Sequence, residues 1–420
     1  MLSIEDNERM CRVGPGTPMG TALRHYWLPA LSSSDLPEAN GDPVHVELLG
    51  EHFVAFRDSN GKVGLLDELC LHRSSSLTVG RVEDGGIRCI YHGWLFSTEG
   101  AVLETPNTTD TALKGRLKAR AYPVREAGGL IWAYLGAGEP SPFPDFPWTE
   151  ADASLRHHTC SIMECNYVQI LEGLVDSAHL SVLHKSFLEA VAGSDLSFAT
   201  KISHMKFDAA PAVGVELTDF GMYYSAVREI DGEAQIRIAP FLQPFWVFNP
   251  NGDQVSCTVP MSDGKTAFYT IWWDGVKKFG EEPLRSKQMQ LVGRTPELLD
   301  KHGFSRKAFE TPRRMSRENG WHQNREAMKK GHFSGLPTLT LEDAVVGVTA
   351  GAIRPREKEM LCAADVGVAM LYRSLLRLPQ QVERNERPSS ASRSVAQLHG
   401  ISVTGPLGAD WKEYLPKQTA

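Results

Sequence analysis

Two mixed pairs of cysteine and histidine constrain this 420-residue chain more than any other feature of its sequence. Cys70 and His72 form the first pair, and Cys89 and His92 form the second, after residues 73–88. A single cysteine is usually a small buried apolar residue, and a single histidine needs no ligand to explain it. Two such pairs close together in the sequence instead predict a metal site.

Two kinds of centre combine two cysteines with two histidines. A structural zinc site usually begins with two cysteines at short spacing and ends with paired histidines, whereas each pair here holds one residue of each kind. Mixed pairs on two loops let both thiolates bind one iron and both imidazoles bind the other, which is the ligand set of a Rieske [2Fe–2S] cluster. We therefore predict a Rieske cluster held by Cys70, His72, Cys89 and His92, with a zinc site as the alternative.

Short strands separated by turns surround this motif and predict a small antiparallel β domain. Four prolines between residues 140 and 147 then predict an extended connector, because proline fixes φ and removes an amide donor. We place the domain boundary there, with a cluster domain and its N-terminal extension at residues 1–148 and a second, catalytic domain at residues 149–420. The expected strands of the first domain are residues 44–49, 52–56, 62–66, 86–90, 94–96, 101–103 and 129–135.

The second domain combines helices with a sheet. Residues 166–187 carry apolar side chains at helical spacing, residues 213–273 return to alternating strands, and helical segments follow within residues 281–330 and 363–378. This order predicts an α+β domain with helices on one face or end of an antiparallel sheet. The final residues, 381–420, show little periodicity, and we expect a loosely packed tail.

A second group of possible ligands, Asp176, His179 and His184, lies in the helical segment after the connector. Two histidines and a carboxylate around open coordination positions form the facial triad of non-haem Fe(II) oxygenases. On a regular helix the two histidines would point about 140° apart, so they need a π-bulge or a break between them to bind one metal. An amphipathic helix with incidental histidines is the alternative, and the upstream cluster motif favours the iron site.

The segment from Asn166 to His184 resembles the pattern N-W-x-Q-x2-E-G-x2-D-S-x-H-x-S-x-L-H. This pattern is typical of the oxygenase (alpha) components of Rieske non-haem iron oxygenases, in the phthalate 4,5-dioxygenase-like group. The resemblance extends from the R-V-G-P-G-T-P-M-G opening to the helix ending near Leu378. It implies a helix-grip-like antiparallel sheet in the catalytic domain, with mononuclear Fe(II) as a second cofactor. The family's first cluster loop usually reads C-P-H-R-G, and Leu71 and Ser74 replace its proline and glycine here.

The resemblance also implies that the third iron ligand lies far along the chain, in a Q-D segment followed by G-x-I-x-D-R. The stretches L-E-D-A-V and, further on, G-A-I-R-P-R fit this layout and make Asp343 the expected ligand, with Asp365 as the second choice. Two positions depart from the pattern: Glu342 replaces a glutamine, and Pro355 stands where aspartate is common.

By the same resemblance, the cluster of one subunit passes electrons to the mononuclear iron of its neighbour in a head-to-tail homotrimer or a multiple of trimers. Asp176 would bridge the interface, accepting hydrogen bonds from His92 of the partner subunit and from His179 of its own chain. Electrons would come from NADH through a separate flavin and iron–sulfur reductase, because this chain lacks the G-x-G-x2-G dinucleotide fingerprint. For Gln169 and Glu172 we expect structural hydrogen bonds.

These features together predict the terminal oxygenase of a Rieske system, which uses O2 and two electrons to hydroxylate or dihydroxylate an aromatic, by resemblance carboxylated, substrate in aromatic hydrocarbon catabolism. Arg228 and Arg237 lie on expected strands and are candidates to hold a carboxylate, because guanidinium pairs bidentately with such groups. Solvated strand arginines are the alternative interpretation. Two other functions remain open: an O-demethylase of a methoxylated aromatic acid, and a Rieske electron-transfer protein without oxygenase activity.

The composition excludes several other classes. The formal net charge is −7 at pH 7 without a basic stretch, so we expect neither a nucleic-acid nor a membrane-surface partner. No apolar run reaches about 18 residues, and the amino terminus mixes both charge signs without the apolar stretch of a secretory signal. Seven cysteines in so long a chain do not form a disulfide framework. We therefore expect a cytoplasmic protein with reduced thiols.

Overall fold

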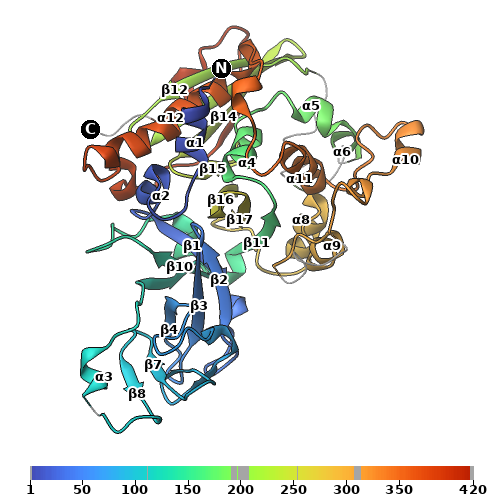
Figure 1. Ribbon diagram of the computed structural model, residues 1–420. Helices are drawn as coiled ribbons and strands as arrows, with labels where there is room; N and C mark the ends of the chain where they lie inside the picture. Colours follow the sequence, from blue (N-terminus) through green and yellow to red (C-terminus); the bar gives the residue numbers. More distant parts are fainter. Residues whose placement is uncertain are drawn as a thin grey trace.

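The computed structural model describes residues 2–110, 112–190, 196, 208–252, 254–306 and 314–416. It consists of a small lobe made mainly of strands and a larger body that combines a long sheet with helices (Figure 1). The strands of the body sheet pair with antiparallel neighbours. The prediction of an α+β fold with antiparallel sheets is therefore confirmed, while the domain boundary at residue 148 stays a prediction.

The small lobe contains two antiparallel sheets. Gly61 adopts a φ of 79° in the hairpin turn between the paired residues Arg57 and Val63. Val54, Phe56 and Phe96 are fully buried in the core between the sheets. The sheets contain, in order, β2 (Val44–Leu48), β3 (Glu51–Arg57) and β4 (Val63–Asp67), and then β5 (Arg81–Glu83), β6 (Gly86–Arg88), β7 (Leu95–Ser97) and β8 (Val102–Glu104), followed by the short helix α3 (Leu113–Arg116).

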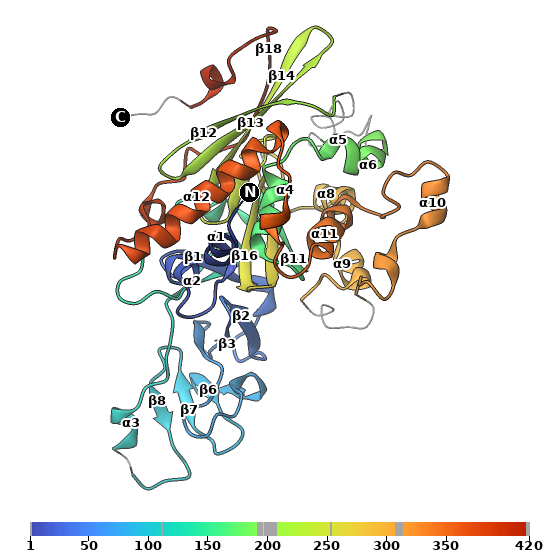
Figure 2. The same ribbon diagram turned by 45° about the horizontal axis from the view of Figure 1, so that its top comes forward.

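The body is built on one long sheet with helices beside it (Figures 1 and 2). Among the described residues the order of this sheet is β11 (Arg156–Met163), β17 (Lys265–Trp273), β16 (Gln254–Ser262), β15 (Trp246–Phe248), β14 (Glu233–Leu242), β13 (Gly221–Ile230) and β12 (Ala212–Leu217), with β18 (Ile401–Gly405) also paired to β14. Its helices are α4 (Tyr167–Leu174), α5 (Leu180–Leu183), α6 (Lys185–Ala190), α8 (Leu284–Val292), α9 (Pro296–His302), α10 (Arg325–Lys329), α11 (Leu339–Thr349) and α12 (Val366–Glu383). Part of the predicted helical stretch 281–330, residues 307–313, lies outside the described residues.

A seam of aromatic rings joins the body sheet to a third, smaller sheet made of β1 (Trp27–Ser32), β10 (Leu130–Tyr134) and β9 (Val124–Ala127). The ring of Trp246 lies 5.7 Å from that of Trp132 and 4.5 Å from that of Phe146. Phe146 and the neighbouring Trp148 are buried, so the proline-rich connector ends inside the core. Aromatic burial of this kind contributes several kcal/mol to holding the two sheets together.

The carboxyl-terminal segment is more ordered than its composition indicates. β18 pairs with β14 through the register Ile236 to Val403, and Val395 and Leu398 are buried before it. The prediction of a loosely packed tail is wrong for this part, because a five-residue strand between a glycine and a proline carries too little periodicity to stand out.

The amino-terminal helices α1 (Ile4–Cys11) and α2 (Pro18–Leu23) pack against α12, so the start of the chain lies against a helix from its last quarter. The side chains of Ser3 and Thr17 accept hydrogen bonds from amides in the first turns of these helices and so cap them. Within the described residues, none of the helices combines the length and the hydrophobicity that spanning a bilayer requires.

Candidate metal centres

Both cysteine–histidine pairs lie on short turns of the small lobe. After β4 the backbone folds back on itself: the amide of Cys70 donates to the carbonyl of Ser75, and the amide of Ser74 donates to the carbonyl of Cys70, each at 2.9 Å. Between β6 and β7 the amide of Gly93 donates to the carbonyl of Cys89 in the same way, also at 2.9 Å. Each turn thus presents a cysteine and, shortly after it, a histidine.

The four side chains on these turns have bonding capacity that the protein itself leaves unused. The rings of His72 and His92 lie 4.5 Å apart, and the Nδ1 atom of each is buried without a hydrogen-bond partner. Cys70 and Cys89 are also buried, and burial raises the pKa of Cys70 to about 11. Buried polar atoms without partners cost free energy. The four residues therefore fit a Rieske cluster, whose ligands are imidazoles and thiolates.

The first cluster loop has Leu71 and Ser74 where the family pattern has proline and glycine. These two replacements have different structural consequences. Ser74 adopts a φ of 52°, in the left-handed region, and Gly93 of the second turn adopts a φ of 75°. A side chain at a left-handed position costs about 1 kcal/mol, which explains why glycine suits this point of the loop. Leu71 is 46% exposed and therefore leaves the buried ligands undisturbed.

The segment that holds His179 and His184 is not one regular helix. α4 ends at Leu174, and the single turn of α5 begins after His179 and ends before His184, which has a φ of −92° and a ψ of 16°. The helix is therefore broken between α4 and the two histidines and ends again at the second one. As a result the two imidazole rings come within 5.1 Å of each other, as a shared metal requires.

Asp343, on α11, lies against both imidazoles. Its Oδ1 atom is 3.0 Å from Nε2 of His184 and 3.8 Å from Nε2 of His179, and one ligand atom from each of the three lies within 4.8 Å of the others. Nε2 of His184 is buried, and this carboxylate is its only neighbour of opposite charge among the described residues. Two imidazoles and one carboxylate fit a mononuclear non-haem iron. The second choice, Asp365, instead accepts a hydrogen bond from the amide of Cys362 at 2.7 Å.

Electrostatics favours a cation at this point. Burial alone would lower the pKa of His184, but the carboxylates of Asp343 and Glu342 raise it to about 10. Burial also opposes the ionisation of Asp343, yet the nearby His184 and His179 lower its pKa below the ordinary value. A metal ion bound here would replace the proton that His184 otherwise holds.

Glu342 contacts the other side of the His184 ring. Its Oε2 atom accepts a hydrogen bond from Nδ1 of His184 at 2.7 Å, and its Oε1 atom accepts one from the hydroxyl of Ser334. Both side chains of the pair are almost fully buried, 1% and 2% exposed. A carboxylate in this position fixes the tautomer and orientation of a ligand imidazole and makes it more basic. The sequence marks Glu342 only as a departure from the family pattern, and no local signal predicts its contact with His184.

Asp176 lies just before α5, beside His179. Its Oδ2 atom is 3.3 Å from Nδ1 of His179, and its Oδ1 atom accepts a hydrogen bond from the amide of Ala178 at 2.8 Å. Burial opposes its ionisation, but the contact with His179 lowers its pKa. The side chain is still 27% exposed, so another molecule has access to it.

Two polar residues of α4 tie the histidine segment to the region around α11. The amide group of Gln169 donates to the carbonyl of Gly347 at 2.8 Å, and the carboxylate of Glu172 accepts a hydrogen bond from Nε of Arg356 at 2.6 Å. Both residues thus make structural hydrogen bonds, as expected. Because α11 carries Asp343, these contacts help to set the distance between its carboxylate and the two histidines.

A cavity of about 330 Å³ opens beside the candidate iron ligands. Of the two strand arginines, Arg237 lines this cavity, and Arg228 does not. The guanidinium of Arg228 donates instead to the backbone carbonyls of Ser177 and Asp208, at 2.7 and 2.9 Å. The apolar part of the wall includes Leu180, Leu183, Phe268, Trp272 and Val292.

A third arginine, Arg294, also lines the cavity and escaped the sequence analysis. It is 4% exposed, its Nε atom donates to the hydroxyl of Thr340 at 3.0 Å, and its guanidinium lies 4.2 Å from the ring centroid of Phe268. Its Nη1 atom is buried without a hydrogen-bond partner. Burial lowers the pKa of Arg294 to about 10. Arg294 follows the left-handed Gly293 at the end of α8, and no strand or motif marks it in the sequence.

Comparison with known proteins agrees with both centres. Residues 26–122 match the family described as Rieske [2Fe-2S] domain, and residues 133–419 match the family described as LigXa C-terminal domain like. The phthalate 4,5-dioxygenase oxygenase subunit of Pseudomonas putida is 35% identical to this chain, over 99% of this chain and 95% of that protein. This chain is a Rieske non-haem iron oxygenase. Its cofactors are a Rieske cluster and a mononuclear iron, which excludes the zinc-site and electron-carrier alternatives.

Two further relatives cover most of this oxygenase. The 3-chlorobenzoate-3,4-dioxygenase oxygenase subunit of Comamonas testosteroni is 34% identical, over 98% of this chain and 97% of that protein. The 5,5'-dehydrodivanillate O-demethylase oxygenase subunit of Sphingobium sp. is 30% identical, over 94% of this chain and 85% of that protein. Like these subunits, the chain is the oxygenase component of its system, and such components receive electrons from a separate reductase or ferredoxin.

Solved structures show the same fold at low sequence identity. Dicamba monooxygenase bound to dicamba has a TM-score of 0.57 and 17% identity, over 87% of this chain and 100% of that one. The terminal oxygenase of carbazole 1,9a-dioxygenase from Novosphingobium sp. KA1 has a TM-score of 0.55 and 20% identity, over 88% of this chain and 97% of that one. At these identities the likeness concerns the fold alone.

Proposed function

We propose that this oxygenase uses O2 and two electrons to hydroxylate or dihydroxylate a carboxylated aromatic substrate, bound in the cavity beside α5 and α11. One observation carries the proposal: His179, His184 and Asp343 converge at the wall of a cavity that Arg237 and Arg294 also line. Iron chemistry and anion recognition are thereby combined in one cavity. Two of the relatives are named for phthalate and 3-chlorobenzoate, which are both aromatic carboxylates.

In this proposal each side chain has a separate task. His179, His184 and Asp343 hold the iron, which when bound supplies the site at which dioxygen reacts. Glu342 keeps the proton of His184 on Nδ1 and so leaves Nε2 free to coordinate. The apolar wall excludes water from the open coordination positions.

The arginines would hold the substrate carboxylate, and Arg294 is the stronger candidate. A buried donor without a partner costs about 1–3 kcal/mol, and Nη1 of Arg294 is such a donor. A substrate carboxylate would supply the missing acceptor through a charge-assisted hydrogen bond. Burial and the nearby Arg228 lower the pKa of Arg237 to about 9, so an anion in the cavity would also stabilise its charged form.

Steady-state kinetics on a panel of aromatic carboxylates and their uncharged amides test this proposal. Arg294→Met should raise KM for the carboxylates about 10- to 100-fold, as expected for the loss of one charge-assisted bond, and should leave kcat nearly unchanged. The matched control is Arg384→Met, which removes an exposed arginine that does not line the cavity. Equal turnover of acids and amides by the wild-type enzyme would contradict the proposed substrate class.

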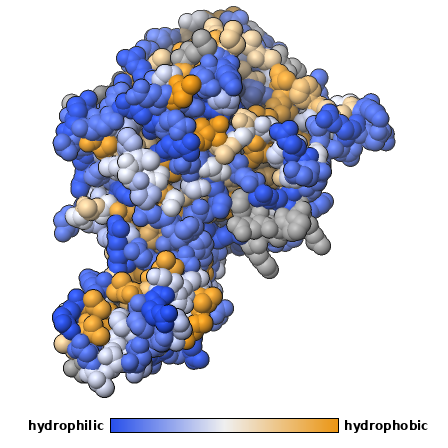
Figure 3. All heavy atoms as spheres, viewed as in Figure 1, coloured by the Kyte–Doolittle hydropathy of each residue, from blue (hydrophilic) through white to orange (hydrophobic). Residues whose placement is uncertain are grey.

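The electron path is a further proposal. We infer a head-to-tail trimer, or a multiple of trimers, in which Asp176 accepts hydrogen bonds from His179 and from His92 of the partner subunit. Exposed apolar residues beside the cluster histidines support an interface there, because Leu71, Ile90 and Tyr91 are 46–59% exposed. Apolar patches are visible on the surface of the small lobe in Figure 3. A flavin and iron–sulfur reductase would supply the electrons from NADH, and we place the system in the cytoplasm on the basis of the cysteine content.

A demethylase is the second candidate function, favoured by the O-demethylase subunit that is similar over 94% of this chain. The same iron centre would attack a methoxy group on an aromatic acid instead of the ring. Release of formaldehyde from methoxybenzoates, measured together with O2 uptake, identifies this reaction. A diol or phenol product without formaldehyde identifies ring attack.

A further inference from the structure

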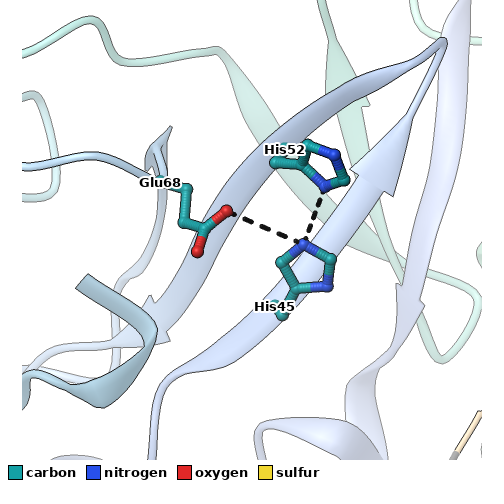
Figure 4. Close-up of side chains that lie close together, drawn as sticks. All are labelled: His45, His52 and Glu68. Carbon is teal, nitrogen blue, oxygen red and sulfur yellow. Dashed lines mark hydrogen bonds and ion pairs between the residues drawn. The ribbon is translucent and has the colours of Figure 1, made fainter. Parts of the chain in front are cut away.

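A second cluster of possible metal ligands lies in the small lobe, outside the cavity and separate from the four cluster ligands. His45 is on β2, His52 is on β3, and Glu68 follows β4 (Figure 4). In the β2–β3 hairpin Glu47 pairs with His52, so His45 and His52 project from the same face of the sheet. We call these three residues, His45, His52 and Glu68, the hairpin site.

The distances in the hairpin site lie close to those between ligand atoms that share an ion. Nε2 of His45 lies 3.0 Å from Nδ1 of His52 and 3.9 Å from Oε2 of Glu68. A hydrogen bond between the two imidazoles would explain the first distance, but 3.9 Å is too long for a hydrogen bond to the carboxylate. Zinc binds imidazole nitrogen and carboxylate oxygen at about 2.0–2.2 Å, which places tetrahedral ligand atoms about 3.3 Å apart. Small side-chain rotations reach that arrangement from the observed one.

The surroundings already orient these ligands. Oε1 of Glu68 accepts a hydrogen bond from the hydroxyl of Ser76 at 2.5 Å, which leaves Oε2 toward His45. Such support of a ligand carboxylate is typical of metal sites. Desolvation of the ring lowers the pKa of His45 below its ordinary value, which favours the neutral imidazole, the form that coordinates metals. His45 and His52 are both exposed, so an ion can enter and a water molecule can complete its coordination.

We propose that the hairpin site binds a divalent first-row transition ion, with Zn²⁺ as the ion that suits two imidazoles and one carboxylate. The bound ion would join the β2–β3 hairpin to the loop that runs from Glu68 to Ser76. That loop carries Cys70 and His72, so the ion would brace one of the two turns that hold the Rieske cluster. This proposal is independent of the substrate and of the mononuclear iron.

Zinc counting on the iron-loaded holoenzyme tests the proposal. The protein is dialysed against a weak chelator and then against Zn²⁺ alone, and zinc and iron per chain are measured together. We expect one additional zinc per chain in the wild type, its loss in His45→Ala and in His52→Ala, and weaker retention in Glu68→Gln. We also expect the cluster absorption to survive to a higher temperature with zinc, and this gain to disappear in the two histidine variants.

Two controls make the count specific. His399→Ala removes another exposed histidine and should leave zinc binding unchanged. His184→Ala disables the candidate iron site, and retention of the additional zinc in this variant separates the hairpin site from that centre. Wild-type zinc content in both His45→Ala and His52→Ala, or no zinc bound by the wild type, would overturn the proposal.

Discussion

The two redox centres of this oxygenase are held in different ways. The cluster turns lie on a lobe whose neighbouring side chains, Leu71, Ile90 and Tyr91, are largely exposed. The candidate iron ligands instead face an internal cavity, and His184 and its partner Glu342 are almost fully buried. The difference corresponds to two tasks: electrons must arrive from another protein through an exposed edge, whereas oxygen chemistry needs a site from which water is excluded.

The hydrogen bonds that support the two centres also differ in how far apart their partners lie in the sequence. Around the cluster, each cysteine is fixed by backbone hydrogen bonds to residues a few positions away, such as Ser75 for Cys70. Around the iron, the hydrogen bonds that orient the ligands join residues 158 and 178 positions apart, His184 to Glu342 and Gln169 to Gly347. Substitutions distant in sequence should therefore disturb the iron centre and spare the cluster.

Removal of one iron ligand tests whether the iron centre can be lost while the cluster is kept, and it has the largest expected effect. His184→Ala should abolish binding of the mononuclear iron and lower turnover by roughly three orders of magnitude or more, because the remaining ligands cannot hold the metal. Iron analysis should fall from about three to about two irons per chain, with unchanged cluster absorption. Asp365→Ala is the matched control and should keep all of its iron. Loss of cluster absorption in His184→Ala would show that the two centres are not independent.

Asp176 tests the one place where the two centres are proposed to meet. Asp176→Asn should keep both metals and lower turnover by roughly 100-fold, because an amide cannot replace the charged acceptor between His179 and His92 of the partner subunit. Single-turnover oxidation of the reduced cluster, followed by its visible spectrum, should slow by the same factor. Asp219→Asn, at an exposed carboxylate, should be silent. A wild-type rate in Asp176→Asn with an intact cluster spectrum would remove the bridging role.

Substitutions of Glu342 measure how much its hydrogen bond to His184 contributes to iron affinity. Glu342→Leu removes the acceptor for Nδ1 of His184 and should weaken iron binding about 10- to 100-fold. Glu342→Gln keeps a neutral acceptor and should have a smaller effect, about 10-fold or less. Iron affinity is measured by competition with a chelator of known affinity, and the cluster spectrum should be unchanged in both variants. Equal affinities for the wild type and Glu342→Leu would mean that packing alone orients His184.

The contrast between local and long-range contacts also explains how much of each centre could be predicted from the sequence. The cluster ligands form a local pattern, so Cys70 and His92 could be assigned from spacing alone. The need for an irregular helix around His179 and His184 followed from helix geometry, and in the structure α5, the single turn between them, ends directly before His184. Asp343 required a family resemblance, because it is far from His184 in the sequence and meets it only in the folded chain. Arg294 could not be found at all, since a loop residue gains its place in a cavity only through tertiary packing.

Ser74 tests the cluster loop, where the supporting contacts are local. Its substitution has the smallest expected effect. Ser74→Gly should stabilise the small lobe by about 0.5–1 kcal/mol, because glycine adopts a φ of 52° without the steric cost that serine bears. The measurement is denaturant unfolding followed by loss of cluster absorption. Ser75→Gly is the matched control: Ser75 is not among the positive-φ residues of the described chain, so glycine there should destabilise the lobe by a similar amount. Because the strain is confined to one turn, iron affinity and KM should not change. Any effect of Ser74→Gly on them would show that the cluster loop is coupled to a catalytic cavity.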